Sequence, residues 1–408
     1  MSLRENANKI MRAALEAAMP DTAVKAALEK AEFSGGKLIL IAAGKAGWQM
    51  AKAACDQMGS RIHGGVVVTK YDHSKGPIAN LDIYEAGHPV PDANSFRATQ
   101  AAIDAVTGLS EEDTVLFLLS GGGSALFEKP LIPEEDLNRL TKQLLACGAD
   151  IVEINTVRKR FSAVKGGRFA ELCKPAKVFT IVLSDVLGDR LDMIASGPAY
   201  PDSSTTEDAQ RIVTKYNLTL TEHMKELLLA ETPKELGNVE THITGSVRQL
   251  CISAEKTCRE LGYEAVILTD RLCCTARDAG VFLSNIARYH GDSGKKMAFL
   301  AGGETVVHLT GHGLGGRNQE LALAAADGIA GMNACVFSVG SDGTDGPTDA
   351  AGGYVDGTTC QSLKQQGILI SDVLQDNDAY HALQKCDGLI ITGATGTNVN
   401  DISVLLIN

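Results

Sequence analysis

Several familiar signatures are missing from this chain of 408 residues. Aromatic residues make up only 5% of it, with a single tryptophan. None of its ten cysteines forms a C-x-x-C pair, and none of its nine histidines lies in an H-E-x-x-H motif. The sequence therefore gives no support for a disulfide framework or a zinc site. Scattered thiols in a large chain are typical of a reduced, cytoplasmic protein.

Long apolar runs are missing as well. The longest, Leu38–Ala43 and Val115–Leu119, have the length of a strand and are too short to cross a membrane. Residues 1–19 lack the apolar core of a signal peptide. We therefore expect no membrane partner and no export signal.

Positive charge is in short supply: 38 basic residues face 50 acidic ones, for a formal net charge of −12. Such a chain is a poor partner for nucleic acid or anionic lipid, and it binds a small anion only where cations gather locally. Apolar residues at 44% and charged residues at 22% are ordinary for a globular protein. The length suggests about two domains, and the oligomeric state stays open, a homo-oligomer included.

Short apolar runs alternate with alanine-rich segments along the first half of the chain. Runs such as 37–43 and 114–120 predict strands, and the segments between them predict helices. This alternation predicts an α/β domain with a parallel sheet and helices on both faces. Pro and Gly among polar residues at Thr232–Gly237 predict a boundary between domains 1–235 and 236–408.

The second domain is predicted to be α/β with a mixed sheet. Two hairpins are expected in it. One joins Lys296–Ala301 to Thr305–Thr310, and the other joins Gly388–Thr392 to Ile402–Ile407.

Glycine is plentiful, with 42 residues that cluster where strands are predicted to end. Ligands bind beyond the carboxyl ends of strands in open α/β sheets. Gly44–Gly47 includes Lys45, which either neutralises a phosphate or carboxylate or is a solvated lysine at a structural turn. This stretch is not G-x-G-x-x-G, and the next strand ends at Lys70 rather than at an acid, which argues against a nicotinamide site.

The second glycine cluster is the run Ser120, Gly121, Gly122, Gly123 and Ser124. A tight turn needs one or two glycines, so three favour a backbone cradle for phosphate over a purely structural turn. The run does not match a Walker P-loop.

Five cations fall within eleven residues on a predicted helix at 156–172. Among them, Arg158, Lys159 and Lys165 either face an anion or form a solvated helix face. Another cation, Arg317, follows a glycine loop at the first turn of a predicted helix, where the helix dipole disfavours it. A bound anion there would explain it.

Acids at strand ends are candidates for Mg²⁺ ligands or for a general base. Asp185 and Asp189 follow a predicted strand, although a helix N-cap is a competing explanation. Glu304 lies between two predicted strands, and Asp342 and Asp345 lie in a loop where turn formation explains them equally well. Anion cradles, cations and strand-terminal acids together are what phosphoryl transfer needs.

Longer motifs run from one end of the chain to the other. They are A-A-G-K-A at Ala42–Ala46, G-H-P-V-P-D at Gly87–Asp92, L-S-G-G-G-S-A-L at Leu119–Leu126, I-N-T-V-R-K at Ile154–Lys159, K-G-G-R at Lys165–Arg168, L-S-D-V-x-G-D at Leu183–Asp189, I-A-S-G-P at Ile194–Pro198, G-G-E-T at Gly302–Thr305, G-G-R-N-Q-E at Gly315–Glu320, S-D-G-T-D-G at Ser341–Gly346 and T-G-T-N-V-N-D at Thr395–Asp401. On these motifs the chain resembles the class II glycerate kinases, also called glycerate 2-kinases.

The resemblance implies an N-terminal Rossmann-like domain, a C-terminal MOFRL domain and an active site in the cleft between them. It implies transfer of the ATP γ-phosphoryl group to the 2-hydroxyl of D-glycerate, with a divalent cation such as Mg²⁺. The family's lysine and arginine match Lys45 and Arg317. Members also carry the label of NAD(P)H-dependent hydroxypyruvate reductases, which is the alternative function.

These observations give a mechanistic hypothesis. Lys45 and Arg317 neutralise charge on the transferring group, and the Ser120–Ser124 turn holds nucleotide phosphates. Asp189, or else Asp185, orients the 2-hydroxyl or holds Mg²⁺. The remaining candidates are Arg158, Lys159 or Lys165 for the glycerate carboxylate and Glu304, Asp342 or Asp345 for the metal.

Overall fold

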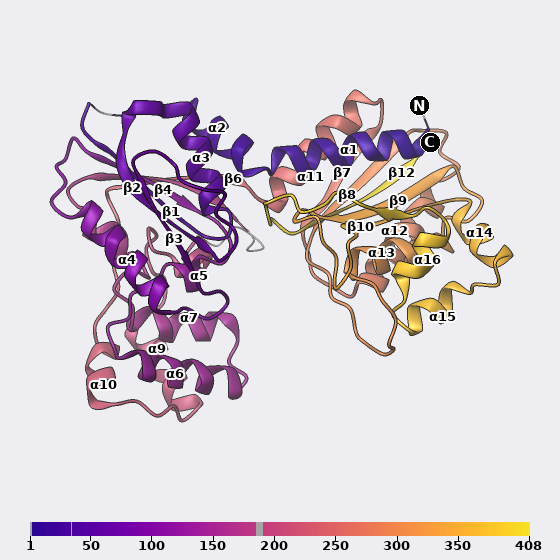
Figure 1. Ribbon diagram of the computed structural model, residues 1–408. Helices are drawn as coiled ribbons and strands as arrows, with labels where there is room; N and C mark the ends of the chain where they lie inside the picture. Colours follow the sequence, from indigo (N-terminus) through magenta and orange to yellow (C-terminus); the bar gives the residue numbers. More distant parts are fainter. Residues whose placement is uncertain (1, 34, 185–190) are drawn as a thin grey trace. The chain divides into compact units, whose positions relative to one another are not determined.

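The computed structural model describes residues 2–33, 35–184 and 191–408 (Figure 1). The chain divides into two compact units. The first unit holds residues 24–244, and the second holds residues 1–23 together with 245–408. Both are α/β, as expected. The first 23 residues, which the sequence assigned to the N-terminal domain, belong to the second unit.

The first unit is built on a six-stranded sheet with the strand order β3-β2-β1-β4-β5-β6. The pairs from β3 to β5 are all parallel, which confirms the predicted parallel sheet. The central strands are almost wholly apolar and buried, because helices cover both faces of a parallel sheet. The strands are β1 (Leu38–Ala43), β2 (Ile62–Lys70), β3 (Leu81–Ala86), β4 (Thr114–Leu119), β5 (Lys177–Leu183) and β6 (Val239–Gly245).

Helices α3 and α4 cover opposite faces of this sheet, and α6, α7, α9 and α10 pack together at one end of the unit (Figure 1). The expected continuous basic helix at 156–172 is wrong. The chain leaves the helix after Arg160, and Gly166 and Gly167 adopt positive φ before a second short helix begins. Helix α2 (Pro20–Leu28) contains the division between the two units. The other helices are α3 (Gly47–Met58), α4 (Ala93–Val106), α5 (Gly123–Leu126), α6 (Glu134–Ala146), α7 (Ile151–Arg160), α8 (Arg168–Leu172), α9 (Thr206–Lys215) and α10 (Glu222–Leu228), with 3-10 turns η1 (Gly59–Arg61) and η2 (Ile194–Ser196).

The second unit has a mixed six-stranded sheet with the order β11-β10-β9-β12-β8-β7. The pair β7–β8 is parallel and the other pairs are antiparallel. The strands are β7 (Glu264–Leu272), β8 (Met297–Gly303), β9 (Ala334–Gly340), β10 (Gly352–Asp356), β11 (Leu389–Ile390) and β12 (Asp401–Ile407).

Both predicted hairpins in this unit are wrong. Strand β8 lies between β7 and β12, and within Thr305–Thr310 only Val306 makes an isolated bridge, to Thr275. The last strand, β12, inserts between β8 and β9 instead of pairing with β11. Every residue of β12 is buried. In the middle of the sheet its apolar side chains remove more surface from water than they would in a terminal hairpin, which stabilises this position.

Helices α1 and α11 pack on one face of the second sheet, and α12 and α13 pack on the other (Figure 1). Helix α1 buries Ile10 and Ala14 there, and Asn6 donates to the Tyr263 hydroxyl at 2.9 Å. These contacts explain why the start of the chain belongs to the second unit. The helices are α1 (Leu3–Ala17), α11 (Val247–Glu260), α12 (Ala276–His290), α13 (Arg317–Ala326), α14 (Thr359–Gln365), α15 (Ile370–Gln375) and α16 (Ala379–Lys385).

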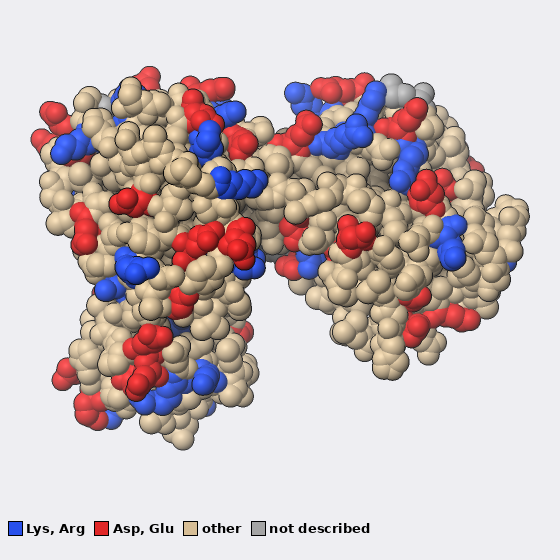
Figure 2. All heavy atoms as spheres, viewed as in Figure 1, with Lys and Arg blue, Asp and Glu red and all other residues tan. Residues whose placement is uncertain are grey.

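Acidic and basic side chains are interspersed over the surfaces in view in Figure 2. Among the described residues, no helix is long and apolar enough to span a membrane.

Candidate active site

Lys45 lies at the carboxyl end of β1, in a turn that the backbone holds firmly. The Lys45 N–H donates to the Gly121 carbonyl at 2.9 Å, and the Thr69 hydroxyl donates to the Lys45 carbonyl at 3.2 Å. Gly44 has a φ of +131°, and a Cβ at this position would overlap the Ser120 side chain. The ends of β1, β2 and β4 therefore fix the backbone of Lys45, while no hydrogen bond or ion pair joins its ammonium to another of the described residues.

The predicted phosphate cradle is a turn that leads from β4 into the short helix α5. Gly122 is left-handed, with a φ of +85°, and α5 begins at Gly123. Ser120 has a structural task here, because its hydroxyl accepts the Ala46 N–H at 3.0 Å and ties the two glycine turns together. Ser124 shares a 3.0 Å hydrogen bond with Ser196.

Further basic side chains surround this turn. A Cβ added to Gly122 would lie 3.0 Å from the His88 ring and 3.1 Å from Lys45 Cγ. His73 Nδ1 lies 3.0 Å from the Lys45 carbonyl, so this nitrogen is the donor. Burial, and then the charges of Lys45, Lys70 and His73, hold the pKa of His88 below its usual value. We call Lys45, Lys70, His73 and His88 the Lys45 cluster.

A substitution at Gly122 tests whether the space over this turn matters. Gly122→Ala would push a methyl group against His88 and Lys45 and would place a side chain at positive φ, which costs about 1–3 kcal/mol. We expect kcat/KM to fall by at least about tenfold. Gly108→Ala is the matched control, because Gly108 also has positive φ but faces open space. Equal losses of activity in the two variants would show that backbone strain alone is responsible.

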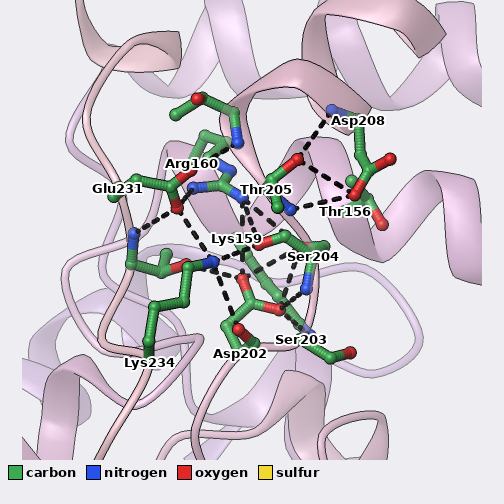
Figure 3. A network of polar contacts seen from close by, with 12 residues as sticks. Thr156, Lys159, Arg160, Asp202, Ser203, Ser204, Thr205, Asp208, Glu231 and Lys234 are labelled. Atoms are coloured by element: carbon green, nitrogen blue, oxygen red, sulfur yellow. Dashed lines mark hydrogen bonds and ion pairs between the residues drawn. The ribbon is translucent and has the colours of Figure 1, made fainter.

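The basic stretch is folded into buried ion pairs (Figure 3). Lys159 Nζ lies 3.0 Å from Asp202, and the Lys159 side chain is 2% exposed. Arg160 is fully buried, pairs with Glu231 at 3.0 Å and donates to the Ser204 carbonyl at 2.8 Å. The sequence showed a run of positive charge but gave no sign of the acids, which come from about 40 to 70 residues further on.

Breaking the Lys159–Asp202 pair should destabilise the protein strongly. Asp202→Asn would leave the buried Lys159 ammonium without its counter-charge, for an expected loss of about 3–5 kcal/mol. Urea unfolding followed by circular dichroism would measure it. Asp56→Asn is the control, because Asp56 and Lys52 form an exposed pair expected to contribute less than about 1 kcal/mol. A comparably small loss for Asp202→Asn would contradict the prediction.

Lys165 is also buried, and its ammonium holds the end of the glycine turn by hydrogen bonds. Its ammonium donates to the carbonyls of Ser124 at 2.8 Å and Phe127 at 3.2 Å, and lies 3.4 Å from Glu128. Burial lowers the pKa of Lys165 to about 8. Arg158 pairs with the same Glu128 at 3.3 Å and keeps 13% of its side chain exposed. Of the three predicted carboxylate-binding cations, Arg158 is thus the most accessible.

In the second unit, Arg317 begins helix α13 and is held by two acids. It contacts Asp401 in a bidentate manner, at 2.6 and 3.1 Å, and Glu304 at 2.8 Å. Hydrogen bonds and charge from these acids raise the pKa of Arg317 despite its partial burial, and burial raises the pKa of Asp401. Asp401 was not singled out from the sequence, although it closes the motif at Thr395–Asp401.

The anion expected at the start of α13 is supplied by the chain itself. Asp345 accepts the N–H groups of Asn318 at 3.1 Å and Gln319 at 2.9 Å, as an acid at a helix N-terminus should. Burial raises the pKa of Asp345 to about 6. Asp342 accepts the Thr344 N–H at 2.9 Å.

The predicted metal ligands do not converge in the part of the chain that the structure covers. Within it, no three side chains of His, Cys, Asp or Glu lie close enough to hold a metal ion. The oxygens of Asp345 already accept backbone N–H groups, and one oxygen of Glu304 is paired with Arg317. Asp185 and Asp189 lie outside the described residues, so their roles stay predictions.

Comparison with known proteins identifies the family to which this chain belongs. Residues 6–229 match a family model described as a domain of unknown function, DUF4147, and residues 297–401 match the MOFRL family. The whole chain is 54% identical to D-glycerate 2-kinase of Thermotoga maritima and 40% identical to glycerate 2-kinase of Pyrococcus horikoshii, and it spans 99% and 98% of these relatives. The chain belongs to the glycerate 2-kinase family.

A solved structure supports the same assignment. The crystal structure of glycerate kinase from Thermotoga maritima matches all of this chain and 99% of its own, with a TM-score of 0.96 and 53% identity. A relative from Agrobacterium vitis that carries the name of a hydroxypyruvate reductase is less similar, at 37% identity over all of this chain and 95% of its own.

Proposed function

We propose that this protein transfers the γ-phosphoryl group of ATP to the 2-hydroxyl of D-glycerate, giving 2-phosphoglycerate and ADP. The observation that carries the proposal is the 54% identity, over the full chain, to a relative named D-glycerate 2-kinase. The Lys45 cluster agrees with it, because basic side chains gather at the carboxyl ends of β1 to β3, where ligands of parallel sheets bind. ATP as the donor, Mg²⁺ and a cytoplasmic location remain predictions from the sequence.

Lys45 and the Ser120–Ser124 turn are the proposed phosphate-binding elements. Phosphoryl transfer spreads negative charge over the oxygens of the moving group, so the enzyme gains most from fixed cations and N–H donors. The Lys45 ammonium supplies a positive charge on a backbone that hydrogen bonds anchor. The left-handed Gly122 gives a ligand close access to the backbone of the turn.

Arg317 is the second proposed cation, and Glu304 and Asp401 hold its guanidinium in one orientation. Asp189, or else Asp185, is proposed to orient the 2-hydroxyl or to bind Mg²⁺. Since Asp342 and Asp345 already accept backbone N–H groups, we expect the nucleotide phosphates to provide most of the metal's ligands.

Arg158 is the proposed partner of the glycerate carboxylate, because it keeps part of its side chain exposed. The other two candidates, Lys159 and Lys165, are buried: Lys159 pairs with Asp202, and Lys165 shares Glu128 with Arg158 and donates to two backbone carbonyls. We therefore assign these two lysines to the support of the fold and of the glycine turn.

The test is to incubate the protein with ATP, Mg²⁺ and D-glycerate and to identify the product by ³¹P NMR. A 2-phosphoglycerate signal is expected. A 3-phosphoglycerate signal would keep the kinase activity but contradict the regiochemistry. Oxidation of NADH with hydroxypyruvate, with no phosphorylated product, would show that the reductase alternative is right.

A further inference from the structure

The motif at Gly87–Asp92 has no catalytic role in the function proposed above, although it places the imidazole of His88 next to Lys45. His88 follows strand β3, and its Nε2 lies 3.1 Å from the position that a Cβ on Gly122 would occupy. Lys45 Cγ lies at the same distance from that position. His88 and Lys45 therefore border one small space, which exists because residue 122 has no side chain.

The His88 imidazole is available for a ligand. The ring is half-buried, and no hydrogen bond joins it to another residue in the described ranges 2–33, 35–184 and 191–408. An acid close in sequence, Asp92, is already engaged, because it accepts the Tyr71 hydroxyl at 2.7 Å and the Ser95 N–H at 3.0 Å. A partly buried imidazole that no described residue engages can give its nitrogen to a substrate.

The surroundings favour the neutral form of this imidazole. The charges that act on it come from Lys45 after β1 and from Lys70 and His73 at the end of β2, and all three are basic. On its own loop, Asp92 is paired as described, and Glu85 accepts the Ser74 N–H at 2.9 Å. Burial and these cations lower the pKa of His88 from its usual value and so favour the unprotonated imidazole, the form that can accept a proton.

We propose that His88 Nε2 accepts the proton of the substrate hydroxyl that attacks the phosphoryl group held by Lys45. This inference rests on the proposed function. The hydroxyl oxygen forms the new bond to phosphorus, the bond from phosphorus to the bridging oxygen breaks, and its electron pair leaves with ADP. The hydroxyl proton moves to Nε2 and later returns to water through the exposed side of the ring. General-base help of this kind contributes about 10²–10⁴-fold.

Steady-state kinetics of His88→Gln would test the proposal in the full-length enzyme. We expect kcat to fall about 100-fold or more, with KM for ATP changed less than about twofold. Wild-type kcat should fall as the pH drops through the lowered pKa of His88, and this acid limb should disappear in the variant. His223→Gln is the control, because His223 is an exposed residue of helix α10 in the same unit.

Chemical rescue separates a proton acceptor from a residue with a structural role. His88→Gly removes the ring, and added imidazole is expected to restore at least a tenth of the lost kcat. Failure of rescue in a variant that melts like the wild type would overturn the proposal. So would a raised KM for ATP with an unchanged kcat, which would make His88 a phosphate ligand. A wild-type enzyme that forms no 2-phosphoglycerate would instead contradict the proposed function itself.

Discussion

Lys45→Ala is expected to lower kcat/KM for D-glycerate about 1,000-fold while leaving the fold intact. Removing one preorganised donor from a charge-stabilising site costs about 10²–10³-fold, and a full positive charge belongs at the upper end of that range. The fold should survive because Gly121 and Thr69 hold the backbone of residue 45 and not its side chain. Initial rates under subsaturating glycerate would measure the loss, and thermal melting would check the fold.

The matched control for Lys45 is a lysine of the adjoining helix. Lys52 lies on α3, has a side chain that is 45% exposed and pairs with Asp56, four residues later. Lys52→Ala should keep kcat/KM within about twofold and should change stability by less than about 1 kcal/mol. If Lys45→Ala also kept near-normal kcat/KM, the assignment of the phosphate site to this turn would be wrong.

The first unit was the easier of the two to predict from the sequence. Its central strands β1 and β4 are buried on both faces, so they read as uninterrupted apolar runs, and its parallel pairs follow from the helices between the strands. The sheet of the second unit depends on pairings between distant segments. Strand β12 pairs with β8 and β9, which lie about 60–110 residues earlier in the chain. The local sequence of β12 does not indicate which strands it pairs with.

The same distinction separates the site residues that could be predicted from those that could not. Lys45 and Gly122 were singled out as candidates because local chemistry, a cation or a glycine at a strand end, marks them. His88 and Asp401 become candidates only because the fold places them beside Lys45 and Arg317, respectively. The buried partner of Lys159, Asp202, is equally distant in sequence. The sequence alone therefore could not show whether the basic stretch binds a ligand or forms ion pairs within the protein.

Arg317→Ala is expected to lower kcat/KM by at least about 100-fold, because it removes the second proposed cation of the phosphoryl site. It should also destabilise the second unit. Asp401 has a side chain that is only 7% exposed, and without Arg317 it would stay buried without its bidentate partner, at a cost of about 3–5 kcal/mol. Kinetics alone therefore cannot assign the role of Arg317, since an unstable enzyme also loses activity.

A double variant separates the two effects. In Arg317→Ala combined with Asp401→Asn, the buried acid loses its charge together with its partner, so the melting temperature should recover most of the way toward the wild type. If Arg317 acts on the transferring phosphoryl group, kcat/KM of the double variant stays as low as that of Arg317→Ala. If activity returns together with stability, Arg317 serves only to neutralise Asp401, and the second cation of the site must be sought elsewhere.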